Sequence, residues 1–184
     1  MSASKSCNLR SQKKLDLTRY SLAGIGDSDS DSNSSSNSAG VIVKDKINGH
    51  VYHQISSRVL YIHTDCSGVV YHAHYLMYFE MARAAIMRTC GHPYAKVEES
   101  GIYCPIIDTS LSYLRPLKYD QLFFIHIRPA ALERATMRFD YVISDEDQNI
   151  YCRGHTTHCT VNRQFRPIQV DISFKEIYEK FSLS

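Results

Sequence analysis

The sequence lacks several features that would assign a protein to a class at once. It has no apolar run of the roughly 18 residues that a membrane-spanning helix needs, because the longest candidate, residues 75–87, is interrupted by Glu80 and Arg83. It also lacks an excess of charge of either sign, with a formal net charge of +2 at pH 7. A nearly balanced charge argues against nucleic acid or an anionic membrane as the main partner. We therefore expect a soluble domain of ordinary size with an additional tail.

Paired cysteine motifs are also missing. The six cysteines include no CxxC pair, and no secretory signal peptide precedes them. We therefore expect reduced thiols and a cytoplasmic protein rather than a disulfide framework. One cluster has the residue types of a zinc site: Cys152, His155, His158 and Cys159. Because this stretch alternates like a strand, His155 and His158 should face opposite sides of a sheet, so we expect neither a metal nor another cofactor.

Residues 1–48 differ in composition from the rest of the chain. The stretch SDSDSNSSSNS, residues 28–38, has seven Ser and no apolar side chain, so it buries too little surface to offset the entropy lost on ordering. Basic residues dominate the first 19 positions, as in an organellar transit peptide, but the acidic residues within 27–31 argue against import. We predict a disordered extension over 1–48 and a folded domain over 49–184.

The folded domain has the pattern of several strands with one buried helix. Residues 51–63 are rich in Val, Ile and Tyr, which predicts a first strand. Residues 74–90 contain good helix formers without Pro or Gly, end before Gly91, and are apolar on nearly all sides, which predicts a buried helix. Four further strands are predicted over 103–114, 121–131, 134–144 and 149–161. The short polar breaks between neighbouring strands indicate antiparallel hairpins.

A last helix is predicted near the end of the chain. Ser173 and Glu176 have the spacing of a capping box. The apolar stripe that follows consists of Phe174, Ile177, Tyr178 and Phe181. The order of elements indicates an α+β fold, in which a five-stranded antiparallel sheet wraps around one helix to bury it. One helix cannot cover so wide a sheet, and the exposed remainder favours pairing of subunits.

The segment HTDCSGVVYHAHYLMYFEMAR, residues 63–83, places ionisable groups directly before the buried helix. Asp65 to His72 connect the first strand to the helix, and Gly68 lets that backbone turn tightly or approach a ligand. Free N–H groups at a helix start can hold an oxyanion or polarise a carbonyl, on which a carboxylate can act as base or nucleophile. The structural alternative is that Asp65 caps a turn, His72 is a hydrogen-bonded histidine and Tyr71 belongs to the core.

The pattern Y-x-x-x-D-x-x-G-V-V-Y-H-A-x-Y-x-x-x-F-E-x-A-R, residues 61–83, resembles that of the hotdog-fold thioesterases of the 4-hydroxybenzoyl-CoA thioesterase family, particularly the YbgC-like acyl-CoA branch. The similarity extends over residues 52–161 and includes GIYCPI and YLRPLKYDQL. The resemblance implies a hotdog fold, a curved antiparallel sheet around one long central helix. It also implies hydrolysis of acyl-CoA or acyl-carrier-protein thioesters by a homodimer or homotetramer, with the active site near a subunit boundary.

The same resemblance implies roles for individual residues. Asp65 would be the catalytic carboxylate, attacking the thioester carbonyl or activating water to do so. A backbone N–H near His72 would polarise the carbonyl oxygen. The side chains of Tyr61 and His72 would orient the carboxylate, the water or the substrate, and Gly68 and Tyr71 would contact the substrate.

Three alternatives stay open. A thiol near a histidine can be a nucleophile, which makes Cys66 a second candidate. Another hotdog branch uses an acid on the central helix, a role open to Glu80, although an ion pair between Glu80 and Arg83 would explain that acid structurally. The alternative function is a hotdog domain that binds acyl thioesters or a protein partner without hydrolysis.

Overall fold

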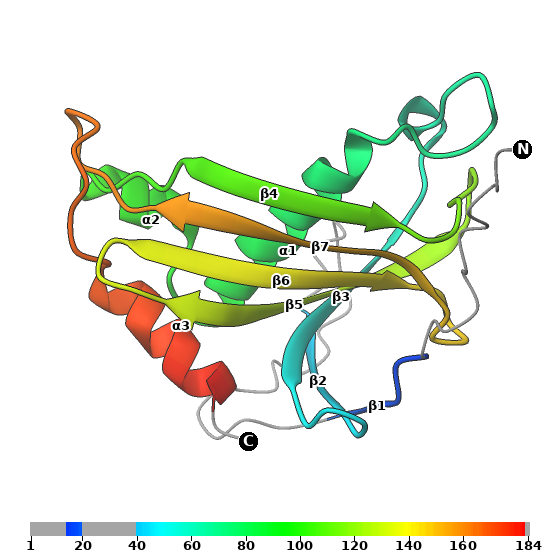
Figure 1. Ribbon diagram of the computed structural model, residues 1–184, viewed down its shortest axis with the longest axis horizontal. Helices are drawn as coiled ribbons and strands as arrows, with labels where there is room; N and C mark the ends of the chain where they lie inside the picture. The colour runs from blue at the N-terminus through cyan, green and yellow to red at the C-terminus, as the bar shows by residue number, and fades with distance from the viewer. Residues whose placement is uncertain (1–13, 20–39, 183–184) are drawn as a thin grey trace, which may run out of the picture.

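A computed structural model describes residues 14–19 and 40–182 of the chain. Its main element is an antiparallel sheet (Figure 1). The seven strands of the sheet follow the order β1-β2-β3-β5-β6-β7-β4. They are β1 (Leu17–Arg19), β2 (Val41–Asp45), β3 (Val51–Arg58), β4 (Ile106–Tyr113), β5 (Leu122–Leu132), β6 (Thr136–Ser144) and β7 (Ile150–Cys159). The helices are α1 (His74–Thr89), α2 (Tyr94–Glu99) and α3 (Ile172–Ser182), with a 3₁₀ helix, η2 (Tyr61–His63). No helix in the described part of the chain is long and apolar enough to cross a membrane.

Helix α1 lies across the inner face of the sheet and fills the core (Figure 1). Its buried side chains are Tyr75, Tyr78, Phe79, Ala82, Ile86 and Met87. The Phe79 ring stacks on that of Tyr141 in β6, with centroids 4.1 Å apart. Gly154 in β7 permits this approach, because a Cβ at that position would lie only 2.7 Å from the Phe79 ring. The predicted buried helix is confirmed over this face. Three apolar residues of α1 are nevertheless exposed: Leu76, Met77 and Met81.

The strands that follow α1 alternate between the core and the outer face. In β6 the inward-facing side chains are buried: Met137, Phe139, Tyr141 and Ile143. β3 is shorter than predicted. The chain leaves the sheet after Arg58, and the His63 N–H donates to the Leu60 carbonyl oxygen to close η2. The other four strands agree with their predicted ranges to within three residues at each end.

Two strands come from the part of the chain that the sequence assigns to a disordered extension. β2 pairs antiparallel with β3, and β1 pairs antiparallel with β2, so the sheet has two strands more than the five predicted. The prediction of disorder over 1–48 is therefore wrong for residues 14–19 and 40–48. The edge of β3 has unpaired backbone groups, and β2 satisfies them by pairing. The serine-rich stretch 28–38 lies outside the described residues.

Helix α3 packs on the sheet through the apolar stripe predicted for it. The stripe is buried: Phe174, Ile177, Tyr178 and Phe181. The predicted capping box of Ser173 and Glu176 is wrong, because the helix starts at Ile172 and places Ser173 inside its first turn. Asp171 accepts the hydrogen bonds instead, from the Ser173 N–H at 3.0 Å and the Ser173 hydroxyl at 2.6 Å. Glu176 pairs with His92, at 2.7 Å between Oε2 and Nε2.

Candidate active site

Asp65 closes a tight turn between η2 and α1. Its N–H donates to the Val69 carbonyl oxygen at 2.9 Å, and its carbonyl oxygen accepts from the Gly68 N–H at 3.0 Å. Gly68 has a φ of +74°, in the left-handed region that favours glycine. The Asp65 Oδ1 accepts the Ser67 N–H at 2.8 Å, whereas Oδ2 has no hydrogen-bond partner among the described residues. The turn-capping interpretation is confirmed, and one carboxylate oxygen is still available to a ligand.

Backbone contacts fix this turn against the loop that joins β4 to β5. Val69 forms an antiparallel bridge with Lys118. The Val70 N–H donates to the Leu117 carbonyl oxygen at 2.9 Å, and Leu117 is fully buried. The Asp65 turn is therefore anchored to the core at the start of α1.

The N-terminus of α1 has no side-chain cap. Ala73 occupies the cap position, and the first turn contains no acidic residue. The N–H groups of His72 and Ala73 donate to no acceptor within residues 14–19 and 40–182, and both residues are exposed. These N–H groups and the positive end of the helix macrodipole are open to a ligand oxygen. The arrangement can polarise a carbonyl group close to the Asp65 carboxylate.

His72 and Tyr71 lie on the same connection, with ring centroids 4.2 Å apart. The Tyr113 hydroxyl, at the end of β4, donates to the His72 carbonyl oxygen at 3.1 Å. The structural interpretation of Tyr71 as a core residue is wrong, because its side chain is 45% exposed. Both rings are therefore available to a bound substrate.

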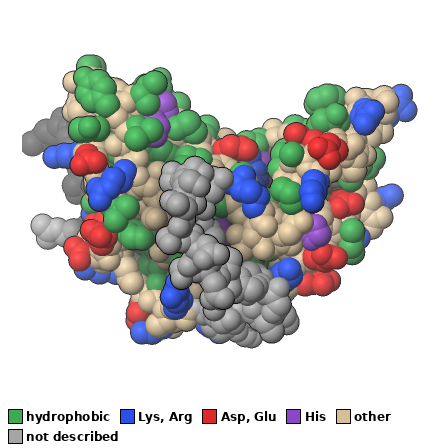
Figure 2. All heavy atoms as spheres, turned by 180° about the vertical axis from the view of Figure 1, so that it is seen from behind, with side chains coloured by type: hydrophobic (Ala, Val, Ile, Leu, Met, Phe, Trp, Pro, Cys, Tyr) green, Lys and Arg blue, Asp and Glu red, His purple; other side chains and the backbone are tan. Residues whose placement is uncertain are grey.

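Tyr61 lies apart from this group, on η2. Its side chain is 78% exposed, and its ring contacts that of Tyr119 edge-on at 5.8 Å. No hydrogen bond joins the side chains of Tyr61, Asp65 and His72 anywhere in the described ranges. Figure 2 shows apolar side chains gathered on the projecting part of the molecule at upper left, where η2 and the Asp65 turn lie. The exposed apolar residues of this region are Leu60, Tyr61, Ile62, Tyr71 and Tyr119.

A buried histidine, His63, contacts α1 next to the candidate site, and no sequence pattern indicated it. His63 is 7% exposed, and its Nδ1 lies 2.8 Å from the Tyr78 hydroxyl of α1. Its ring lies 5.1 Å from that of His74. Burial, and then the nearby His74, lower the pKa of His63. The 3.6-residue period of the helix places His74 and Tyr78 on one face, but it does not indicate that His63 lies against them.

The two alternative catalytic residues lie in different surroundings. Cys66 is an exposed free cysteine in the Asp65 turn. Glu80 forms an ion pair with Arg83 on α1, and its side chain is 58% exposed. The ion pair expected as the structural explanation of Glu80 is confirmed.

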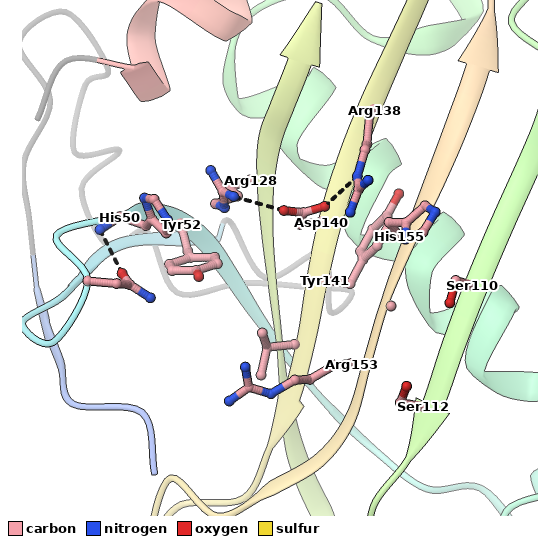
Figure 3. Close-up of a pocket in the computed structure, with 13 residues that line it drawn as sticks. His50, Tyr52, Ser110, Ser112, Arg128, Arg138, Asp140, Tyr141, Arg153 and His155 are labelled. Atoms are coloured by element: carbon pink, nitrogen blue, oxygen red, sulfur yellow. Dashed lines mark hydrogen bonds and ion pairs between the residues drawn. The ribbon is translucent and has the colours of Figure 1, made fainter. Parts of the chain in front are cut away.

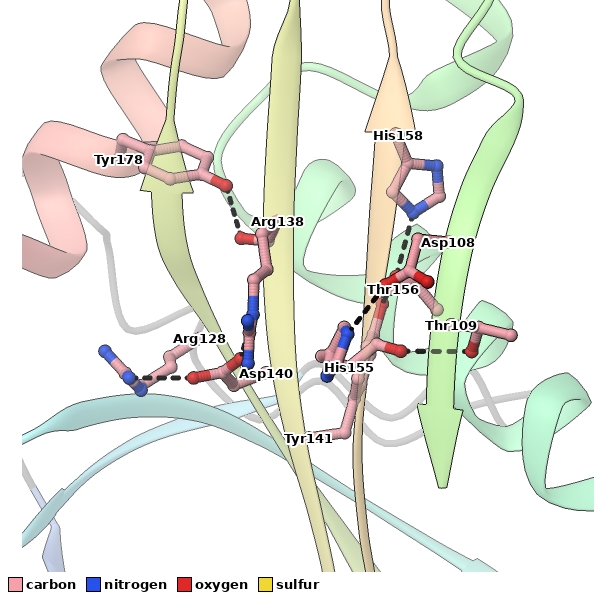
Figure 4. A network of polar contacts seen from close by, with 10 residues as sticks. All are labelled: Asp108, Thr109, Arg128, Arg138, Asp140, Tyr141, His155, Thr156, His158 and Tyr178. Atoms are coloured by element: carbon pink, nitrogen blue, oxygen red, sulfur yellow. Dashed lines mark hydrogen bonds and ion pairs between the residues drawn. The ribbon is translucent and has the colours of Figure 1, made fainter. Parts of the chain in front are cut away.

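The Cys/His cluster of β7 is divided by the sheet, as predicted. The His155 Nε2 lies 2.9 Å from an oxygen of Asp108 on the outer face (Figure 4). His158 is buried on the inner side, and its Nδ1 lies 2.9 Å from the Cys104 carbonyl oxygen. In the described part of the chain, no three His, Cys, Asp or Glu side chains are grouped to hold a metal ion.

The sequence is similar to several known proteins. A family model described as the thioesterase superfamily matches residues 67–152, which include Gly68, Tyr71 and His72 and begin just after Asp65. A protein named "Putative esterase" from Aquifex aeolicus is 36% identical over 104 residues, 56% of this chain and 80% of that protein. "Putative acyl-CoA thioesterase YneP" from Bacillus subtilis is 30% identical over 126 residues, 66% of this chain and 91% of that protein.

Solved structures of thioesterases have a similar fold. A DHNA-CoA thioesterase from Staphylococcus aureus has a TM-score of 0.65 at 27% identity, covering 71% of this chain and 89% of that chain. A 1,4-dihydroxy-2-naphthoyl-CoA thioesterase from Synechocystis has a TM-score of 0.67 at 16% identity, covering 71% and 98% respectively. The expected hotdog fold, with α1 wrapped by the sheet, is confirmed.

Proposed function

Because the chain belongs to the thioesterase superfamily, we propose that it hydrolyses an acyl-CoA thioester to a free acid and a thiol. Relatives named as acyl-CoA thioesterases support this substrate class, among them YbgC of Haemophilus influenzae, 33% identical over 84 residues. One observation carries the mechanism: the Asp65 turn lies directly before an uncapped helix N-terminus. A carboxylate and a polarising site for the carbonyl oxygen are the two parts that thioester hydrolysis needs.

In this mechanism the thioester carbonyl oxygen accepts hydrogen bonds from the N–H groups of His72 and Ala73. These donors and the macrodipole of α1 stabilise the negative charge that develops as the carbonyl carbon becomes tetrahedral. Asp65 uses its unpaired Oδ2 either to attack the carbon or to take the proton of an attacking water. When Asp65 acts as the base, the C–S bond breaks and the proton taken from water passes from Asp65 to the sulfur, which leaves as a thiol. When Asp65 attacks the carbon, breaking the C–S bond leaves the acyl group on Asp65 as an anhydride; water then hydrolyses this anhydride to the free acid and supplies the proton that the departed thiolate takes up.

The remaining side chains position the substrate. Gly68 and the exposed Tyr71 contact the substrate beside the helix start. The His72 ring, held against Tyr71, orients the substrate or water. Tyr61 is a positioning residue on the η2 side of the turn, where bound substrate covers its exposed ring.

Substitution of Asp65 by Asn tests this mechanism. Asn has an oxygen that can still accept the Ser67 N–H, so the turn keeps its hydrogen bond while the charge is lost. We expect kcat to fall by roughly 10²-fold or more, as for loss of a base or nucleophile. The measurement is thiol release from acyl-CoA substrates, with a thermal melt of each variant to separate chemistry from folding.

Neighbouring substitutions serve as controls. Cys66→Ala, in the same turn, should have a mild effect. His72→Ala should reduce turnover less than Asp65→Asn, because the backbone N–H survives the substitution. The mechanism is wrong if Asp65→Asn keeps the parental rate while Cys66→Ala or Glu80→Gln folds but is inactive. Wild-type protein that binds acyl-CoA without releasing thiol would instead identify a non-hydrolytic binding domain.

A further inference from the structure

A groove of about 400 Å³ lies on the outer face of the sheet (Figure 3). One wall comes from the β2–β3 turn and the start of β3, with His50 and Tyr52. The rest is lined from β4, β5, β6 and β7. Asp140 in β6 lies between inward-facing neighbours and therefore points to the face opposite α1. The groove is thus separated from the candidate active site by the thickness of the sheet.

The charges in this groove are unequal. Arg128, Arg138 and Arg153 line it together with a single acidic residue, Asp140. The Arg128 Nη2 lies 2.8 Å from Asp140 Oδ2 and the Arg138 Nε lies 2.9 Å from Oδ1, so both carboxylate oxygens already accept a hydrogen bond (Figure 4). Among the lining residues, three guanidinium groups and one carboxylate leave two positive charges; outside the lining, the Asp108 carboxylate lies 2.9 Å from His155.

Arg153 supplies the guanidinium group that is free to bind a ligand. It is exposed on β7, and none of its side-chain N–H groups has an acceptor in the described part of the chain. Figure 3 shows it pointing into the groove from the side opposite Arg128 and Asp140. Ser110 and Ser112 of β4 contribute hydroxyl groups to the same lining. Guanidinium and hydroxyl donors around a surplus of two positive charges match a doubly charged phosphate group.

We propose that this outer-face groove binds a phosphate ester or diphosphate, with Arg153 as its main ligand-binding residue and Arg128 and Arg138 held in place by Asp140. The groove volume of about 400 Å³ is within the usual range for small-molecule sites. Arginine is suited to this role because its planar fork can donate two hydrogen bonds to one phosphate.

Two sources of phosphate share this chemistry. One is a free phosphate-bearing ligand that binds the outer face independently of the reaction. The other is the nucleotide end of an acyl-CoA substrate that passes the edge of β4, because Ser112 in the groove is adjacent to Tyr113, whose hydroxyl donates to the His72 carbonyl oxygen at 3.1 Å. Only the second source depends on the function proposed above.

Titration calorimetry with inorganic pyrophosphate tests the site without any need for turnover. The full chain should bind pyrophosphate, and Arg153→Gln should weaken this binding about tenfold, as expected for loss of a charge-assisted hydrogen bond. Arg88→Gln is the matched control, because it removes the same charge from an exposed position on α1 outside the groove. The proposal fails if wild type shows no binding at millimolar pyrophosphate, or if Arg153→Gln and Arg88→Gln bind equally well.

Steady-state kinetics with acyl-CoA and acyl-pantetheine distinguish the two sources. If the groove holds the substrate's own phosphates, Arg153→Gln raises KM for acyl-CoA about tenfold and leaves KM for acyl-pantetheine unchanged. If both KM values stay at the wild-type level while pyrophosphate binding is weakened, the groove binds a free phosphate ligand. Either result supports the site. An inactive wild-type enzyme would contradict the proposed hydrolysis, and the calorimetric result would still stand.

Discussion

At the scale of single residues, the Asp65 carboxylate combines a structural and a proposed chemical role. Its Oδ1 accepts the Ser67 N–H at 2.8 Å, so the side chain is oriented before any substrate arrives, and its Oδ2 is unpaired within the described ranges. The local sequence left Asp65 open between a turn cap and a catalytic carboxylate, and the family resemblance implied the catalytic role. The sequence could not indicate the contact between His63 and Tyr78, which depends on the chain leaving the sheet after Arg58.

Two buried histidines make the stability of the protein depend on pH. Burial lowers the pKa of His53 to about 4 and that of His126 to about 3. Their Nε2 atoms lie 3.0 Å from the Thr89 hydroxyl and 2.9 Å from the Ser144 hydroxyl. Their Nδ1 atoms have no partner in the described structure. Both imidazoles are therefore neutral in the folded state at neutral pH, where protonation would leave a buried charge unpaired.

The expected outcome is a loss of stability on acidification. A histidine with a lowered folded-state pKa contributes its full stability above the unfolded value of about 6.5 and loses it as the pH falls, because the unfolded chain takes up the proton first. Each such group should reduce the free energy of unfolding by about 1.4 kcal/mol per pH unit below about 6. Urea unfolding at pH 7, 6 and 5 measures the slope, and His126→Asn should make it shallower. An unchanged slope in that variant would contradict the assignment.

At the scale of elements, the strands and helices after residue 50 follow from local patterns, and the first two strands do not. Buried and partly buried residues alternate along β6 from Thr136 to Tyr141, and α1 consists of good helix formers and ends before Gly91, so the local sequence was sufficient for both. β1 has three residues and β2 has five, and both are held by pairing along β3. Strands this short depend on neighbouring strands for their stability, so their own composition gives little sign of a strand. Composition therefore suggested an unstructured extension.

Removal of residues 1–48 should therefore destabilise the domain, contrary to the expectation for a disordered tail. The deletion removes β2 from the edge of β3 and uncovers the buried side chains of Val51 and His53. It also removes Leu15, which is 5% exposed and packs against Val142 and Ile150. We expect the Tm to fall by several degrees or more, since the loss of a few buried side chains costs several kcal/mol. Calorimetry on the full chain and on variants that lack residues 1–48 or 1–13 measures this, and the longer deletion should give the lower Tm. Equal Tm values for the two variants would show that β1 and β2 contribute nothing to stability.

At the scale of the whole molecule, the sheet ends in an exposed strand beside the candidate active site. β4 is the last strand in the sheet order (Figure 1), and nearly all of its residues are exposed. Its apolar residues include Ile106 at 46%, Ile107 at 57% and Tyr113 at 48% exposure. An open strand edge with apolar side chains is suited to pair with another strand, and a second copy of β4 satisfies both edges at once. The homodimer or homotetramer expected from the sequence is consistent with this edge and stays a prediction.

Substitution of Ile107 by Glu should separate the subunits without unfolding them. The side chain is already 57% exposed in the single chain, so a charge there costs little within one subunit, but burial of that charge between two β4 strands would be strongly unfavourable. Ile47→Glu is a matched control, because Ile47 is 56% exposed in the β2–β3 turn, away from β4. Light scattering at micromolar concentration should give a dimer or larger assembly for wild type and Ile47→Glu, and a monomer for Ile107→Glu.

The monomer should also lose thioesterase activity, because Tyr113 links β4 to the His72 carbonyl oxygen at 3.1 Å and the subunit boundary then borders the start of α1. A stable wild-type monomer, or full activity in monomeric Ile107→Glu, would place the complete site within one chain.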